Sequence, residues 1–178
     1  MTNQQEPKAN QVLRDCIAGN RSAQYTLYQL FAPIVYAVCL RYMGQSDDAK
    51  DMLQDTMIKV FQKAEKFRFQ GSLEGWVKRI AVNTCLDHLK QKKKIFTDEL
   101  ESAKQIIGDV NASHTLEAKD LMHLLSALPV GYRIVFNLYA IEGYSHAEIA
   151  AILGISENTS KTQLFKARKS LQSKLERN

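Results

Sequence analysis

The chain has 178 residues, 45% hydrophobic and 24% charged, which is enough apolar material for the packed core of a soluble globular protein. Its formal net charge of +5 is uneven: residues 1–95 carry 15 Lys and Arg against 9 Asp and Glu, residues 96–117 carry 1 against 5, and residues 118–178 carry 8 against 5. No apolar run approaches the roughly 20 residues of a membrane span and the polar start lacks a signal-peptide core, so we predict a cytoplasmic protein without membrane insertion.

Apolar positions recur every three or four residues almost throughout, so the predicted fold is all-α. A short helix is expected from about residue 10 to 18, and a longer one from about residue 22 to Gly44, with Pro33 as a site of kinking. The apolar face of the longer helix is Leu27, Leu30, Phe31, Ile34, Val35, Val38 and Tyr42.

The next predicted helix begins at Asp47 and has two contrasting sides. Its apolar stripe faces the core, whereas Asp48, Asp51 and Asp55 give the other side an acidic character. This acidic side suits a basic protein surface, although a solvated helix face has the same composition.

A loop at residues 67–72 and a helix from about Leu73 to the basic run 90–94 come next. Aromatic residues stand beside basic ones here, a combination that suits unstacked bases of single-stranded DNA, because rings stack on bases while cations hold the backbone. The alternatives stay open at this stage: Trp76 is the kind of residue found more often in a core, and Asn83 could simply face water.

From residue 96 to 117 the helical pattern weakens and acidic and small residues dominate, which predicts a flexible acidic linker between two small domains, 1–95 and 118–178. In the second domain helices are expected at 116–128, ending before Pro129, and at 131–142. The apolar residues of the latter are Ile134, Val135, Leu138 and Ile141.

The segment 144–156 predicts a helix-turn-helix. Ser145 and Glu148 form a capping box at the start of its first helix, Gly154 permits the sharp turn, and Ser156 caps the second helix. The second helix carries the basic run 161–169, so it can enter a DNA major groove; an ordinary helical hairpin is the less favoured interpretation.

Three motifs in this order resemble those of the extracytoplasmic-function (ECF) sigma factors, members of the sigma-70 family of bacterial RNA polymerase initiation factors. They are residues 47–56 with Phe67-Arg68, then residues 76–87, and then Leu128-Pro129 with 144–156 and 161–171. The resemblance spans nearly the whole chain and implies a sigma2-like helical bundle followed by a sigma4-like helix-turn-helix domain. Implied partners are core RNA polymerase and promoter DNA, joined, where one exists, by an anti-sigma factor.

The resemblance also implies three sets of site residues. The set that docks on core polymerase is Asp48, Asp51, Gln54 and Asp55. The set that binds the minus-10 element is Phe67, Arg68, Trp76, Lys78, Arg79, Asn83, His88 and Lys90, with Asn83 reading a base flipped out of the duplex. The set at the minus-35 element is Asn158, Thr159, Lys161, Thr162, Phe165, Lys166, Arg168 and Lys169.

Within the minus-35 set, Lys161 can donate to guanine, whereas Arg168 and Lys169 suit phosphates. Leu164 and Leu171 should pack inward. The sequence departs from the family pattern in two places: Ser160 replaces an apolar packing residue, which predicts looser packing, and Gln163 stands where Arg is common, which removes one expected phosphate contact.

No catalytic motif is found, the four histidines lack metal-ligand spacing, and the three cysteines have none either, so we expect neither an enzyme nor a cofactor. The leading hypothesis is a sigma factor that brings core polymerase to promoters and promotes DNA melting. A conventional helix-turn-helix regulator with an amino-terminal sensing or dimerisation domain is the main alternative, and a helical protein adaptor is a third.

Overall fold

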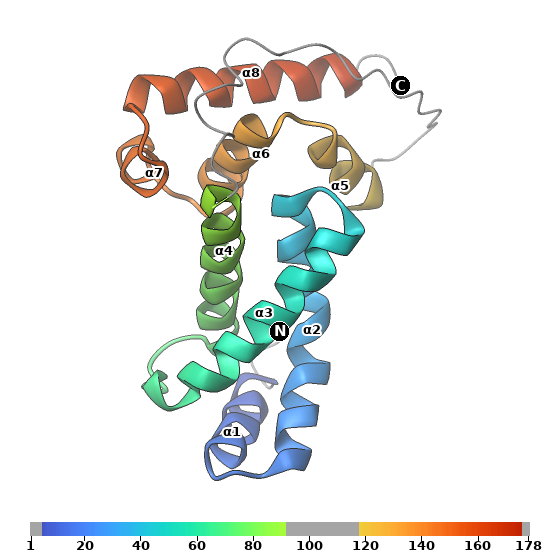
Figure 1. Ribbon diagram of the computed structural model, residues 1–178, viewed down its shortest axis with the longest axis vertical. Helices are drawn as coiled ribbons and strands as arrows, with labels where there is room; N and C mark the ends of the chain where they lie inside the picture. Colours follow the sequence, from blue (N-terminus) through green and yellow to red (C-terminus); the bar gives the residue numbers. More distant parts are fainter. Residues whose placement is uncertain (1–4, 92–117, 176–178) are drawn as a thin grey trace. The chain divides into compact units, whose positions relative to one another are not determined.

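The computed structural model describes residues 5–91 and 118–175, and every regular element in these two ranges is a helix (Figure 1). The predicted linker, 96–117, lies outside the described residues, so its flexibility stays a prediction. Contacts group the chain into two compact units: Met1–Leu40 with Gln45–His88, and Arg41–Gly44 with Leu89–Asn178. The chain thus has two compact units, as predicted, while the domain bounds 1–95 and 118–178 stay predictions.

The first unit is built from α1 (Gln5–Ile17), most of α2 (Arg21–Met43), α3 (Ser46–Lys63), the short 3-10 helix η1 (Ala64–Lys66) and most of α4 (Leu73–Gln91). Helix α1 starts earlier than predicted, because the polar residues 5–9 carry little apolar signal and a proline is tolerated in a first helical turn. Gly19 and Gly44 follow α1 and α2 with positive φ, as expected of helix ends.

The core of the first unit largely follows the predicted apolar faces, although Ile34 is only half-buried. Leu30 is exposed, and Thr56 is buried among the apolar residues of α3. The buried residues of the core are Leu13, Leu27, Phe31, Val35, Val38, Cys39, Ala49, Met52, Met57, Val60, Leu73, Val77, Ala81 and Cys85. Cys16, Cys39 and Cys85 are all buried thiols outside any disulfide, and hydrogen bonding from the Cys85 thiol, helped by Thr56, lowers the pKa of Cys39.

By length and composition, α2 is able to cross a membrane, which the sequence analysis did not anticipate. Its 18-residue window has a mean hydropathy of 1.2, but the core helix of a soluble protein passes the same test. Leu27, Phe31, Val35 and Val38 form a buried stripe, which is the pattern of a core helix.

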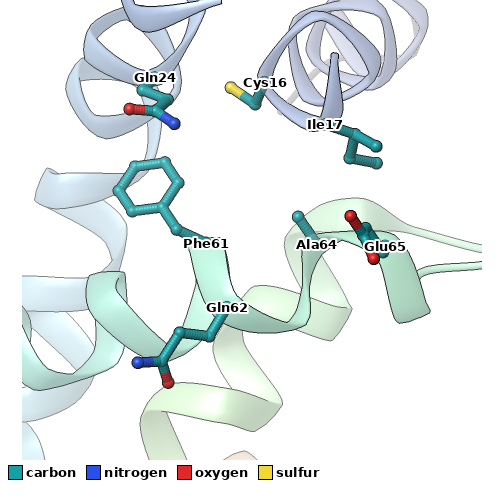
Figure 2. Close-up of a pocket in the computed structure, with 7 residues that line it drawn as sticks. All are labelled: Cys16, Ile17, Gln24, Phe61, Gln62, Ala64 and Glu65. Carbon is teal, nitrogen blue, oxygen red and sulfur yellow. The ribbon is translucent and has the colours of Figure 1, made fainter. Parts of the chain in front are cut away.

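A hollow of about 200 Å³ lies where α1, α2 and the end of α3 meet, lined by residues such as Cys16, Gln24 and Phe61 (Figure 2). Burial, together with the neighbouring Asp15 carboxylate, raises the pKa of the Cys16 thiol. The hollow is smaller than the roughly 300–1,000 Å³ of typical small-molecule sites.

The second unit contains α5 (Ala118–Ser126), α6 (Val130–Phe136), the π-helical segment η2 (Asn137–Ile141), α7 (His146–Leu153) and α8 (Glu157–Leu175). Its core includes Leu124, Leu125 and Leu128 packed against Ala167 and Leu171 of α8. Arg133 donates to the carbonyls of Ser126 (2.9 Å) and Leu128 (3.3 Å), which satisfies backbone groups at the end of α5.

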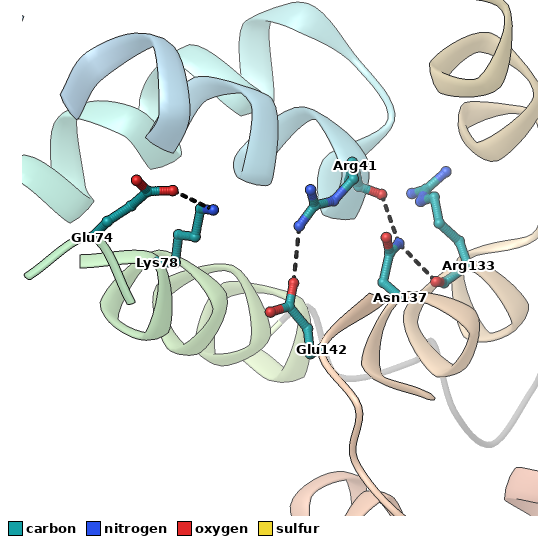
Figure 3. A network of polar contacts seen from close by, with 6 residues as sticks. All are labelled: Arg41, Glu74, Lys78, Arg133, Asn137 and Glu142. Atoms are coloured by element: carbon teal, nitrogen blue, oxygen red, sulfur yellow. Dashed lines mark hydrogen bonds and ion pairs between the residues drawn. The ribbon is translucent and has the colours of Figure 1, made fainter. Parts of the chain in front are cut away.

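The predicted helix 131–142 is interrupted by the wider turn of η2. The Glu142 N–H bonds to the Asn137 carbonyl five residues earlier (3.0 Å), and the Asn137 amide donates to the carbonyl of Arg133 at 2.9 Å (Figure 3). A π-turn rotates the residues that follow it relative to an α-helix. Ile141, predicted to face the core, is therefore 41% exposed.

Candidate nucleic-acid interface

Local hydrogen bonds build the helix-turn-helix as the sequence predicted. The Glu148 N–H donates to Ser145 Oγ (3.3 Å), and the Ser145 N–H donates back to Glu148 Oε2 (2.8 Å), which completes the capping box at the start of α7. The bond from the Ser145 N–H, together with one from the Ser145 hydroxyl to the same oxygen (2.7 Å), lowers the pKa of the Glu148 carboxyl. Gly154 then adopts a φ of 69°, in the left-handed region, and ends α7.

Helix α8 starts from Ser156, whose hydroxyl accepts the N–H of Thr159 at 3.0 Å. The Thr159 hydroxyl lies 2.8 Å from Ser156 Oγ, so this residue of the predicted minus-35 set is also part of the cap. Leu164 and Leu171 are buried, as predicted, together with Ser160 and Ala167.

The outer side of α8 holds most of the predicted minus-35 residues. Thr159 is half-buried, and the exposed members of the set are Asn158, Lys161, Thr162, Phe165, Lys166, Arg168 and Lys169. Phe165 is 67% exposed, which is unusual for a large aromatic residue without a partner in the fold. Lys161 Nζ lies 3.7 Å from the Glu157 carboxylate, an exposed pair weak enough for Lys161 to exchange it for a base or phosphate.

Ser160 does not loosen the packing, as the sequence had suggested, because it has a polar partner. It is fully buried, and its Oγ lies 2.9 Å from Nδ1 of His146, the first residue of α7. The imidazole also stacks on the Tyr139 ring, with 4.6 Å between centroids. Neither residue was in the predicted site; the available signal was a polar residue at an apolar position of α8.

Two cations of α8 lie over tyrosine rings. The Arg168 guanidinium carbon is 5.6 Å from the Tyr139 centroid, and Lys166 Nζ is 6.0 Å from the Tyr132 centroid. The Arg168 distance falls within the roughly 6 Å range of cation–π attraction, and the Lys166 distance lies at its limit.

In the first unit the predicted minus-10 residues divide into an aromatic cluster and an exposed polar face. Phe67 is only 6% exposed, and its ring lies 5.2 Å from those of Phe69 and Trp76. Phe69, absent from the predicted set, has a positive φ of 54°, and the Arg14 guanidinium lies 4.0 Å from its ring. The packing of these rings therefore stabilises the conformation of the 67–72 loop.

Helix α4 gathers Arg79, Asn83 and Lys90 on one exposed side, within about 40° of arc at 100° per residue. Lys78 is turned away from them and forms an ion pair of 2.6 Å with Glu74, and hydrogen bonding to Lys78 lowers the pKa of that carboxyl (Figure 3). His88 is half-buried and lies roughly 180° from Arg79 around the helix, so the geometry separates it from the other predicted residues.

On α3, Asp51, Gln54 and Asp55 are exposed and Asp48 is half-buried, opposite the buried residues Ala49, Met52, Thr56, Met57 and Val60. Ile58, which the sequence analysis did not single out, is 53% exposed and lies between Asp51 and Gln54 around the helix. An apolar side chain ringed by carboxylates and an amide is suited to a protein partner with a basic rim.

Comparison with known proteins accounts for both units. Residues 27–95 match the family described as sigma-70 region 2, and residues 118–171 match sigma-70 region 4. The ECF RNA polymerase sigma factor SigM of Mycobacterium tuberculosis is 32% identical over 152 residues, which cover 85% of this chain and 76% of SigM. SigW of Bacillus subtilis, also an ECF sigma factor, is 27% identical over 175 residues, covering 88% and 91% of the two chains.

A solved structure has the same fold: the sigma factor RpoE of Bartonella quintana, determined in complex with the anti-sigma factor NepR. It superposes with a TM-score of 0.51 at 23% identity and covers 85% of this chain and 96% of that one. A conventional helix-turn-helix regulator is not favoured, because its amino-terminal half would not match sigma-70 region 2. The chain is therefore a transcription initiation factor that belongs to the ECF group of the sigma-70 family of RNA polymerase sigma factors.

Proposed function

We propose that this sigma factor divides its work among three surfaces. The exposed side of α3 docks on core polymerase, the 67–72 loop with α4 takes up the unpaired minus-10 strand, and α8 reads the minus-35 duplex. The observation that carries this proposal is the outer side of α8, where cations, amides and one aromatic residue follow a fully capped turn.

For polymerase docking, the supporting features are the carboxylates of α3 and the exposed Ile58 between them. Charge complementarity steers association and selects the partner, while the apolar residue adds buried contact area. Asp51→Arg combined with Asp55→Arg should abolish binding to core polymerase while the far-UV spectrum stays unchanged. Glu65→Arg, a reversal of an exposed carboxylate outside α3, serves as the matched control.

For the minus-10 strand, the supporting feature is the row of Arg79, Asn83 and Lys90 on α4. Asn83 can donate and accept hydrogen bonds at once, as the edge of an extruded base requires, and the two cations suit flanking phosphates. Asn83→Ala should relax selectivity among minus-10 variants more than it weakens minus-35 binding. Equal losses on every promoter variant would contradict the assignment.

For the minus-35 element, Phe165 lies near the centre of the exposed arc of α8, and Lys161 lies about 40° from it, toward the buried side, where its long side chain can still extend to a base edge. Lys166 and Arg168 lie on either side of them, where phosphates of the two groove walls would be reached. Lys169 belongs to the same cationic face.

The decisive experiment is run-off transcription with purified core polymerase on fragmented genomic DNA, followed by mapping of the start sites. Discrete starts that require this chain, and that share upstream and downstream elements, are the expected result. Starts independent of the chain, or tight binding to promoter duplex by the chain alone as a dimer, would contradict the proposal.

We further propose that the protein works in the cytoplasm and has no enzymatic activity of its own, with all bond formation left to the polymerase. The solved complex of RpoE with NepR supports a third partner, an anti-sigma factor that keeps this chain from the polymerase. Co-purification of the tagged full-length chain before and after induction would identify such a partner.

A further inference from the structure

Four side chains from three elements of the second unit are linked in a continuous series of contacts. Ser160 of α8 lies within hydrogen-bond distance of His146 of α7, His146 stacks on Tyr139 of η2, and Tyr139 in turn lies beneath the guanidinium of Arg168 on α8. The series begins on α8 at Ser160, which is buried, and ends on α8 at Arg168, which is exposed and about two turns further along the helix. Its last member is thus the only one fully available to a ligand.

Arg168 occupies a flank of the DNA-facing side of α8. It lies about 20° from Lys161 and about 60° from Phe165 around the helix, on the side toward the buried residues. A cation at this position reaches a groove wall rather than the base edges.

The chemistry of a guanidinium allows it to keep its ring partner while binding a phosphate. A guanidinium can place its flat face over an aromatic ring while its N–H donors point outward in the guanidinium plane, and the Arg168 guanidinium carbon is 5.6 Å from the Tyr139 centroid. A long side chain that is already held over a ring also loses less rotamer freedom when it binds than one moving freely in water.

From this geometry we infer that Tyr139, supported by His146 and Ser160, is a positioning residue that holds Arg168 ready for a backbone phosphate of the minus-35 duplex. The inference rests on the proposed minus-35 role of α8 and adds a residue that never touches DNA. Tyr139 therefore contributes to promoter affinity through Arg168 alone.

The test uses the full-length chain assembled with core polymerase and a promoter fragment taken from a start site mapped by run-off transcription. The affinity of the holoenzyme for this fragment is measured for Arg168→Gln, Tyr139→Leu, Tyr139→Phe and the double variant Arg168→Gln with Tyr139→Leu. Arg168→Gln should weaken binding and reduce the slope of log affinity against log salt by about one, as loss of one phosphate contact requires.

Tyr139→Leu should weaken binding about three- to tenfold, and the double variant should be no weaker than Arg168→Gln alone. Tyr139→Phe should keep the affinity of the parent, because the ring is retained. Arg168→Lys should lose part of this affinity. An ammonium group is not planar, so it cannot stack a flat face on the ring while its N–H donors point outward to a phosphate. Tyr139→Leu combined with Lys169→Ala, an exposed neighbour on α8, should show the product of the two single effects.

A premelted fork template that lacks the upstream duplex separates positioning from general damage. Tyr139→Leu should leave binding to this template unchanged, whereas a misfolded chain would bind neither template. Multiplicative losses from Tyr139→Leu and Arg168→Gln on the full promoter would overturn the inference while leaving the minus-35 role of α8 intact. No effect of Arg168→Gln would instead remove the predicted phosphate contact, and the inference with it.

Discussion

The hydroxyl of Ser160 offers a direct measure of how a polar pair stabilises the interior of the helix-turn-helix. In Ser160→Ala the hydroxyl that lies 2.9 Å from His146 Nδ1 is removed without adding volume to a fully buried site. Loss of one neutral hydrogen bond costs about 0.5–1.5 kcal/mol, and the half-buried imidazole can recover part of this by binding water. Alanine regains roughly 0.4 kcal/mol of helix propensity, so the net destabilisation should be about 0.1–1 kcal/mol.

The assay is urea denaturation of the full-length chain, followed by far-UV circular dichroism. Ser173→Ala is the matched control, since Ser173 is an exposed serine of α8 whose hydroxyl bonds to the Ser170 carbonyl of the same helix. Subtracting its effect removes the propensity gain, so the difference between the two variants should be about 1 kcal/mol. In a double-mutant cycle, Ser160→Ala should cost nothing further once His146→Ala is present.

If Ser160→Ala were as stable as Ser173→Ala, or if its cost were the same with and without His146, the hydrogen bond would contribute nothing and burial alone would explain the serine. Ser160→Val tests the family's apolar choice at this position. It should be less stable than Ser160→Ala, because the added methyl groups must fit a site already filled by the imidazole.

Three further predictions concern the same unit. Lys161→Ala should cost about 1–3 kcal/mol of discrimination at one minus-35 position, seen as a flattened preference when transcription is compared across single-base variants; a uniform loss would indicate a phosphate contact. Gly154→Ala should lower stability by about 1–2 kcal/mol, because φ is positive there and no atom lies within 4 Å of the added Cβ to add a clash. The pKa of Glu148 in the folded protein is lower than its ordinary value, so its contribution to stability should be present at neutral pH and be lost as the pH falls through that lowered pKa. Glu148→Gln should remove this acid-dependent step, which melting temperatures recorded between neutral pH and about pH 3 would reveal.

Local signals made most of the helix-turn-helix predictable from the sequence. Ser145, Glu148 and Gly154 act through bonds and backbone angles within a few residues of one another, so their pattern is sufficient. The inward side of α8 was likewise predictable from the spacing of Leu164 and Leu171. Family membership followed from the order of three motifs along the chain.

What the sequence could not provide depends on contacts between distant residues. The partner of Ser160 is 14 residues away on another helix, and the exposure of Ile141 results from a π-turn that periodicity does not reveal. The burial of Phe67 depends on how its loop packs in the first unit, whereas the separation of His88 from Arg79 was available from helical spacing alone. The individual contacts to polymerase and DNA remain predictions, since they form only with those partners.

The aromatic cluster around Phe67 has a practical consequence. Trp76 is the single tryptophan of the chain, and its ring lies 5.2 Å from that of Phe67, at the base of the loop proposed to receive an extruded base. Its fluorescence is therefore a natural optical reporter of strand capture, without any attached dye. A change in its emission during stopped-flow mixing of holoenzyme with promoter would give the rate at which the bubble opens.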